Sequence, residues 1–75
     1  ALAFDALKRG GNAPTVYNAA NEKAVALFLS RKIAYLTITE MIETCLDRIS
    51  FVPNPTVEQI LETEQAVYEF IESRW

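Results

Sequence analysis

The chain has 75 residues, which is enough for one small domain spanning residues 1–75 and too few for two. Hydrophobic residues make up 51% and charged residues 23%, which is typical of a globular rather than a disordered chain. The net charge of −3 and the scattered basic residues disfavour binding to nucleic acids and to anionic membrane surfaces.

The start of the chain and its one cysteine indicate its context. No apolar run approaches the roughly 20 residues of a membrane span, and no basic leader precedes an apolar block. The chain opens on a helical pattern without a methionine, so we expect it to be cut from a longer protein. Cys45 has no partner for an internal disulfide, which suits a reducing compartment. Its place on an apolar stripe predicts a buried, unreactive thiol.

The first half of the chain predicts two helices. The first covers residues 1–9, with an apolar face of Ala3, Ala6 and Leu7, and the Gly10-Gly11 pair ends it. The second runs from about residue 14 to residue 30, and Pro14 suits its first turn.

The second half predicts two more helices. The third covers residues 38–49, with a capping box from Thr37 to Glu40 and a regular apolar stripe. Residues 32–39 could form a short strand, but we favour a loop leading into this helix. Prolines 53 and 55 then break the chain, and the fourth helix covers residues 56–74. The stripes are Ile38, Met41, Ile42, Cys45, Leu46 and Ile49 for the third helix, and Val57, Ile60, Leu61, Val67, Tyr68 and Ile71 for the fourth.

These elements predict an all-α fold, a small bundle of three to four helices with short connections and antiparallel neighbours. Trp75 extends the last stripe, and we expect it to pack on the bundle or to anchor an interface.

Three polar side chains interrupt the otherwise apolar second helix. Asn18, Asn21 and Glu22 share one stripe, which Val25 and Leu29 continue. We expect this helix to be covered by two neighbours, with a solvent face of Ala19, Lys23, Ala26 and Ser30. The polar trio is then a structural or interdomain connector, hydrogen-bonded to backbone of the residue 10–14 loop or of another domain. The chain offers no histidine and no second carboxylate in this helix, so catalysis is disfavoured.

The other polar patterns are weak indications of a site. Glu58 and Glu62 are spaced so that a divalent ion could bridge them, but hard cations need more ligands, and a solvated acidic face is favoured. Gly10-Gly11 lacks the full phosphate-loop pattern and is better explained as a helix end. The sequence therefore predicts no catalytic, cofactor-binding or metal-binding residue.

One set of residues carries a family resemblance. Residues 10–29 read GG-x-x-P-x-x-x-NAANE-x-AV-x-x-FL, and KIAYLTITEMIE follows shortly after. This stretch resembles the C-terminal domain of 1-deoxy-D-xylulose 5-phosphate reductoisomerase. The last helix is less similar, because Val67-Tyr68 stands where the family often has Ala-Arg.

The resemblance implies a three-part enzyme with an NADPH-binding domain, a catalytic and dimerising domain, and this helical bundle. Such enzymes convert 1-deoxy-D-xylulose 5-phosphate to 2-C-methyl-D-erythritol 4-phosphate in isoprenoid biosynthesis, using NADPH and Mg²⁺ or Mn²⁺. The implied partners are the upstream domains and a second copy of the whole enzyme, in a bacterial cytoplasm or a plastid-type organelle. The family's ligands lie upstream, so this piece alone is expected to be inactive and to bind neither NADPH nor metal. The alternative is a stand-alone helical interaction module.

Overall fold

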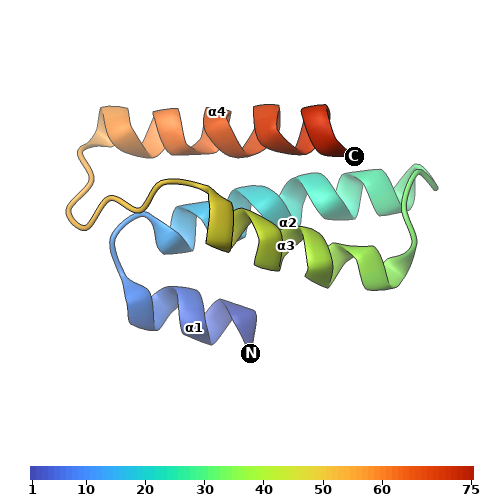
Figure 1. Ribbon diagram of the computed structural model, residues 1–75, viewed down its shortest axis with the longest axis horizontal. Helices are drawn as coiled ribbons and strands as arrows, with labels where there is room; N and C mark the ends of the chain where they lie inside the picture. Colours follow the sequence, from blue (N-terminus) through green and yellow to red (C-terminus); the bar gives the residue numbers. More distant parts are fainter.

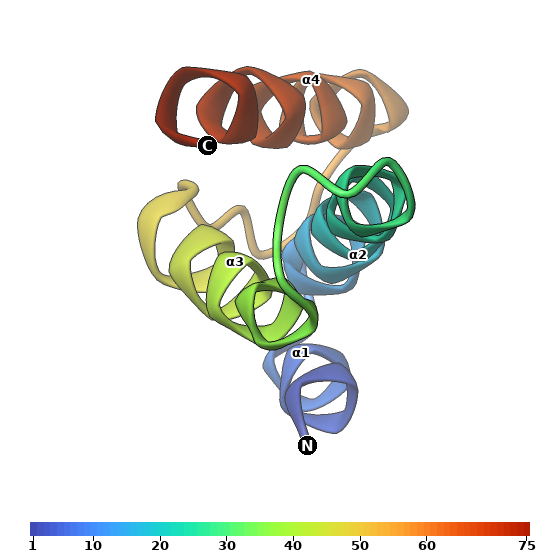
Figure 2. The same cartoon turned by 90° about the vertical axis from the view of Figure 1, so that its right-hand side faces the viewer.

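All 75 residues are described by the computed structural model, which contains four helices and no strand. They are α1 (Leu2–Arg9), α2 (Ala13–Leu29), α3 (Tyr35–Arg48) and α4 (Val57–Arg74) (Figure 1). Seen along the bundle, α2 and α3 form a middle layer between α1 on one side and α4 on the other (Figure 2). The prediction of a small all-α bundle is confirmed.

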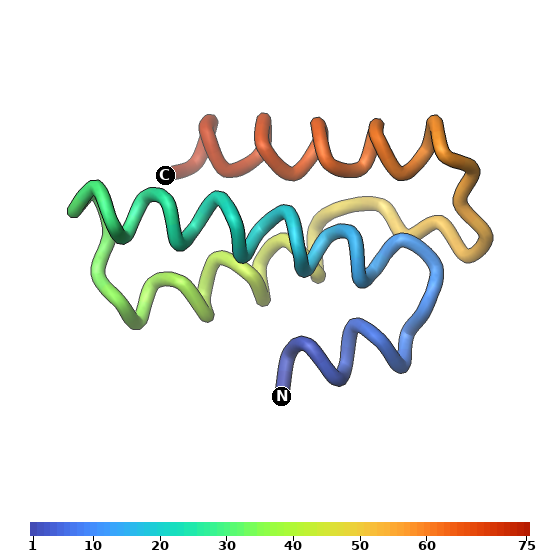
Figure 3. Tube along the Cα trace, turned by 180° about the vertical axis from the view of Figure 1, so that it is seen from behind, coloured from blue at the N-terminus to red at the C-terminus, as the bar shows by residue number.

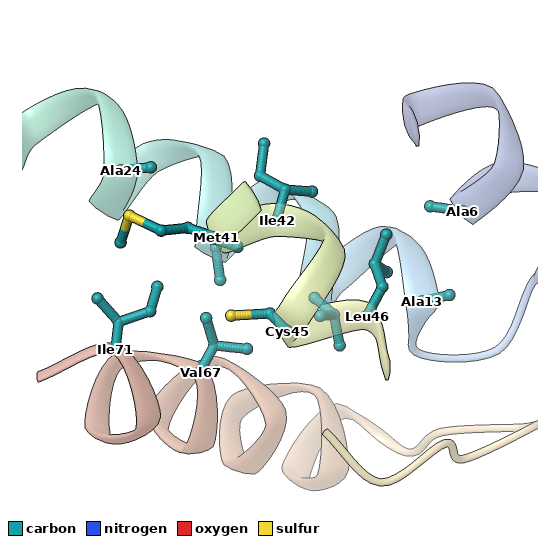
Figure 4. Packing of buried hydrophobic residues seen from close by; sticks show 12 residues of the cluster. Ala6, Ala13, Ala24, Met41, Ile42, Cys45, Leu46, Val67 and Ile71 are labelled. Carbon is teal, nitrogen blue, oxygen red and sulfur yellow. The ribbon is translucent and has the colours of Figure 1, made fainter. Parts of the chain in front are cut away.

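Helix α2 is the centre of the fold, because it packs against all three other helices. Its inward face is built from small residues, and Ala20 and Ala24 are fully buried. Met41 and Cys45 from α3 lie between α2 and α4, toward Val67 and Ile71 (Figure 4). Small side chains on α2 allow the neighbouring helices to approach it closely, so their longer side chains fill the space between the layers. The core consists of Ala6, Ala13, Val16, Ala19, Ala20, Ala24, Met41, Ile42, Cys45, Leu46, Val67 and Ile71.

Two helix ends follow the chemistry of their sequence. Helix α1 ends at Gly10, whose φ of 69° lies in the left-handed region that glycine adopts without strain. Helix α4 begins with a capping box, in which the Thr56 side chain accepts from the Gln59 amide and the Gln59 side chain accepts from the Thr56 amide. The predicted helix end at the glycine pair is confirmed.

The start of α3 differs from the prediction. The helix begins at Tyr35 after Ala34, so Thr37 and Glu40 lie inside it and form no capping box. At this helix start the ring of Tyr35 packs edge-on against Phe28 of α2, with 5.6 Å between ring centroids, a tertiary contact that the local pattern around Thr37 does not indicate. Of residues 32–39, only 32–34 form the expected loop, which follows a turn with Arg31 at φ 62°; residues 35–39 belong to α3, and none forms a strand.

Packing between the layers also corrects three predicted faces. Ala19 was assigned to the solvent face of α2 but is buried, and Lys23, one turn further along the same side of α2, pairs with Glu72 of α4. In α4, Val57 and Leu61 are 74% and 59% exposed, while Thr63 is buried in their place. Thr63 meets Asn12, which also bonds to Ser50 in the loop after α3, so the inward positions of this half of α4 are set by contacts distant in the sequence. In α1, Ala3 and Leu7 are exposed, since α2 covers only a narrow stripe of this helix. The apolar stripe predicted for α3 is confirmed.

Cys45 is completely buried, as its place on the α3 stripe predicted. Burial raises the pKa of the Cys45 thiol from 9.0 to about 11. The unfolded chain therefore ionises at lower pH than the folded one, so this group's contribution to stability is intact below pH 9 and is lost between pH 9 and about 11.

We expect urea unfolding of the wild type to show this additional loss of stability in alkaline solution. The Cys45→Ala variant, which has no thiol to titrate, should show a smaller loss over the same pH interval. Parallel pH profiles for the two proteins would contradict the assignment.

Candidate interdomain surface

The polar trio of α2 lies on the outside of the bundle. Asn18 and Glu22 are exposed, and Asn21 is half-buried. Val25 and Leu29 continue the same stripe, and Leu29 is 73% exposed. This stripe lies opposite the buried Ala20 and Ala24, so the bundle itself covers little of it. We call Asn18, Glu22, Val25 and Leu29 the outer face of α2.

The outer face is polar at the start of the helix and apolar at its end. A helix that carries exposed valine and leucine beside asparagine and glutamate is mixed in the way that surfaces between domains usually are. The exposed apolar side chains are compatible with burial against another domain, and the amide and carboxylate groups supply hydrogen-bonding partners. Such a surface can recognise protein, but it contains no nucleophile or acid–base pair.

Glu22 makes the one recorded side-chain hydrogen bond of the trio. The Tyr68 hydroxyl of α4 donates to its Oε1 at 3.0 Å. This hydrogen bond to the carboxylate is the main cause that raises the pKa of Tyr68 above its ordinary value. One position along α2, the Lys23 ammonium lies 3.3 Å from a carboxylate oxygen of Glu72. These two contacts link the edge of α2 to α4, but both are exposed, so each contributes little to stability.

No member of the trio bonds to the loop of residues 10–14, which was one of the two expected partners. Asn21 has no side-chain hydrogen bond and instead lines a groove between α1, α2 and α3. Hydrogen bonding of these side chains to a neighbouring domain stays a prediction.

The buried asparagine of this region is Asn12, which the sequence reasoning missed. It is 1% exposed, and its Nδ2 donates to the Ser50 carbonyl at 2.9 Å and to Thr63 Oγ1 at 3.1 Å. Its Oδ1 accepts from the Val52 amide at 2.8 Å. The Asn12 amide also donates to the Val52 carbonyl at 2.9 Å. One side chain thus joins the start of α2 to the loop after α3 and to α4.

A sequence signal for Asn12 did exist. An asparagine between a glycine pair and a proline at a helix start suggests an N-cap. Asn12 does occupy the N-cap position of α2, but its side chain makes no capping bond. Its side chain instead bonds to residues roughly forty and fifty positions later in the chain. No local sequence pattern can indicate such distant partners.

The other candidate residues show no assembled site. Glu58 and Glu62 are both exposed on α4, and nowhere do three or more His, Cys, Asp or Glu side chains gather as metal ligands would. Trp75 packs edge-on against Phe70, with 6.2 Å between ring centroids, so it rests on the end of its own helix. None of the four helices has the length and apolar character of a membrane span.

Comparison with known proteins supplies the context of this bundle. Residues 1–70 match the family model described as the DXP reductoisomerase C-terminal domain. The 1-deoxy-D-xylulose 5-phosphate reductoisomerase of Agathobacter rectalis is 56% identical over 75 residues, which is 100% of this chain and 20% of that protein.

Two other relatives with the same printed name agree. The protein of Lachnospira eligens is 57% identical over 74 residues, and that of Thermoanaerobacter sp. is 43% identical over 74 residues. Both alignments include 99% of this chain but only 20% and 19% of those proteins. The chain therefore spans about a fifth of the length of the relatives it matches. No solved structure matches the chain.

Proposed function

Because the chain belongs to the DXP reductoisomerase C-terminal domain family, we propose that it is the C-terminal helical domain of such an enzyme. The whole protein would use NADPH to convert 1-deoxy-D-xylulose 5-phosphate to 2-C-methyl-D-erythritol 4-phosphate, in isoprenoid biosynthesis. The role of this domain is to support the catalytic domain and to help frame the cleft in which the sugar phosphate reacts. We place the protein in the bacterial cytoplasm, since the three relatives described above come from bacteria.

The observation that carries the supporting role is the outer face of α2. The NAANE segment places polar residues on the surface of α2. The buried residues of the bundle are all hydrophobic except Asn12 and Thr63. A polar and apolar surface with no catalytic group beside it fits contact with another protein domain better than it fits chemistry. We therefore assign Asn18, Asn21 and Glu22 to contact with the upstream domains.

The residues of this chain do not fit the cofactors of the whole enzyme. A divalent cation prefers six or more oxygen ligands, and no cluster of three acidic side chains is present. The Gly10-Gly11 pair ends a helix and turns toward residues 51 and 52, so it does not form a phosphate-binding loop. We assign NADPH and Mg²⁺ or Mn²⁺ to the upstream four-fifths of the protein, together with the contacts that form its homodimer.

An activity measurement tests this assignment. We expect the full-length protein to oxidise NADPH when 1-deoxy-D-xylulose 5-phosphate and Mg²⁺ are supplied. The 75-residue chain alone should show no oxidation above the rate without enzyme. Turnover by the 75-residue chain would contradict the supporting role, and a full-length protein without turnover would contradict the proposed reaction.

The alternative is a stand-alone helical module that binds other proteins. It would require that the natural product of this gene ends close to the 75 residues on both sides. The matches to proteins about five times as long favour the enzyme, since they cover this chain from its first residue. Mass measurement of the native protein separates the two possibilities.

A further inference from the structure

A groove opens at the start of α1, on the face where α1 meets the middle layer. Its volume is about 400 Å³, and six of its eight lining residues are hydrophobic. The lining consists of residues 1–3 at the start of α1, Tyr17 and Asn21 of α2, and Ile38, Thr39 and Ile42 of α3. The groove thus covers one helical turn of α2 and one of α3.

The groove lies where α1 would continue if it were longer. Helix α1 runs antiparallel to α2, and its first residue lies beside the middle of α2 (Figures 1 and 3). The second half of α2 therefore has no neighbour on this side. A backward continuation of α1 from the N-terminus would run along the second half of α2 (Figure 3). Asn21 of α2 lines the groove together with the start of α1. The α1 stripe of Leu2 and Ala6 already packs on the core, so further turns of the same helix would reach the floor of the groove.

We infer that the segment immediately preceding Ala1 in the full-length protein continues α1 by about one turn, roughly four residues, and fills this groove. This inference rests on the proposed function, because it requires the upstream chain of the longer enzyme. Chain continuity identifies the segment that occupies the groove. Four-fifths of each aligned relative lies outside the part that matches, and the matching part is a C-terminal domain. A segment tethered at Ala1 has a far higher effective concentration at the groove than any separate partner.

The proposed extension has a definite chemical pattern. Residues three and four positions before Leu2 fall on the same helical stripe as Leu2 and Ala6. These are the second and third residues before Ala1, and they should be apolar because they face Tyr17, Ile38 and Ile42. The extension would also cover Asn21, so that the amide finds partners in the longer protein that this chain does not supply.

Hydrogen exchange of the full-length protein, followed by mass spectrometry, tests the inference. The carbonyls of the four added residues would accept from the amides of residues 1–4, so we expect these amides to exchange more than about tenfold slower than an unstructured chain. A Thr39→Trp variant, whose indole would occupy the groove, should return these amides toward the unstructured rate. The control is Glu40→Trp. Glu40 is the next residue of α3, is exposed and does not line the groove.

Each outcome decides the question. Fast exchange of the amides of residues 1–4 in the wild type would overturn the inference. So would protection that survives in the Thr39→Trp variant, or that is lost equally in the Glu40→Trp control. Reductoisomerase activity is measured on the same three proteins: an inactive wild type would overturn the proposed function whatever its exchange pattern, and an active wild type with fast exchange would overturn only the helix extension.

Discussion

Replacing Asn12 with alanine is expected to destabilise the bundle by about 3 kcal/mol or more, the largest effect of any single polar side chain here. The substitution removes three side-chain hydrogen bonds at once and leaves the Val52 amide and the Ser50 carbonyl without those partners. A buried group that loses its partner costs about 1–3 kcal/mol, and solvent can reach only part of this site. Because small domains have about 5–15 kcal/mol in total, a large part of the stability would be lost.

Thermal or urea unfolding of the 75-residue chain measures this effect. The matched control is Asn18→Ala, which changes an exposed asparagine on the same helix that has no recorded side-chain hydrogen bond. We expect the control to stay within about 0.5 kcal/mol of the wild type. Equal losses in the two variants would mean that Asn12 does not hold the loop after α3.

Replacing Gly11 with alanine is expected to cost about 2–3 kcal/mol. Its φ of 58° is unfavourable for an L-residue, and an added Cβ would overlap the Val52 carbonyl oxygen and lie 2.9 Å from the Phe51 ring. That carbonyl is backbone and accepts from the Asn12 amide, so it cannot move without disturbing the same connection.

The neighbouring glycine provides the control for this prediction. Gly10 has a similar φ of 69°, but an added Cβ would meet no atom within 4 Å. The Gly10→Ala variant should therefore show only the backbone cost of about 1 kcal/mol. Unfolding of the two variants in parallel separates conformational strain from steric overlap, and equal destabilisation would contradict the close approach of residue 11 to residue 52.

Local patterns were sufficient to predict much of this fold. The four helices, the glycine end of α1 and the α3 stripe depend on interactions within one or two turns, so their residues alone indicate them. The same is true of Cys45, whose burial followed from its spacing relative to Ile42 and Ile49. The resemblance carried by residues 10–29 also identified the family that the comparisons show.

The errors arose where distant segments meet. Nothing near Thr63 in the sequence indicates that Asn12 will bond to it, and nothing near Ala19 indicates that α4 will cover it. The assignment of Asn18, Asn21 and Glu22 to an interdomain contact stays a prediction. The faces of α2 that the other helices cover were harder to predict. Periodicity alone cannot distinguish a buried face of alanines from a solvent face.

We propose that the outer face of α2 contacts the upstream domains of a reductoisomerase. The most direct test replaces Val25 and Leu29 together with lysine, both in the 75-residue chain and in the full-length protein. Both side chains are exposed in the bundle, so the short chain should change by no more than about 1 kcal/mol.

In the full-length protein the same double variant should lower the melting temperature and kcat/KM together, because two charges would be placed in a contact between domains. Melting of both proteins, with turnover of the longer one, is the decisive measurement. We expect a loss confined to the full-length protein. A full-length double variant with the melting temperature and kcat/KM of the wild type would contradict it.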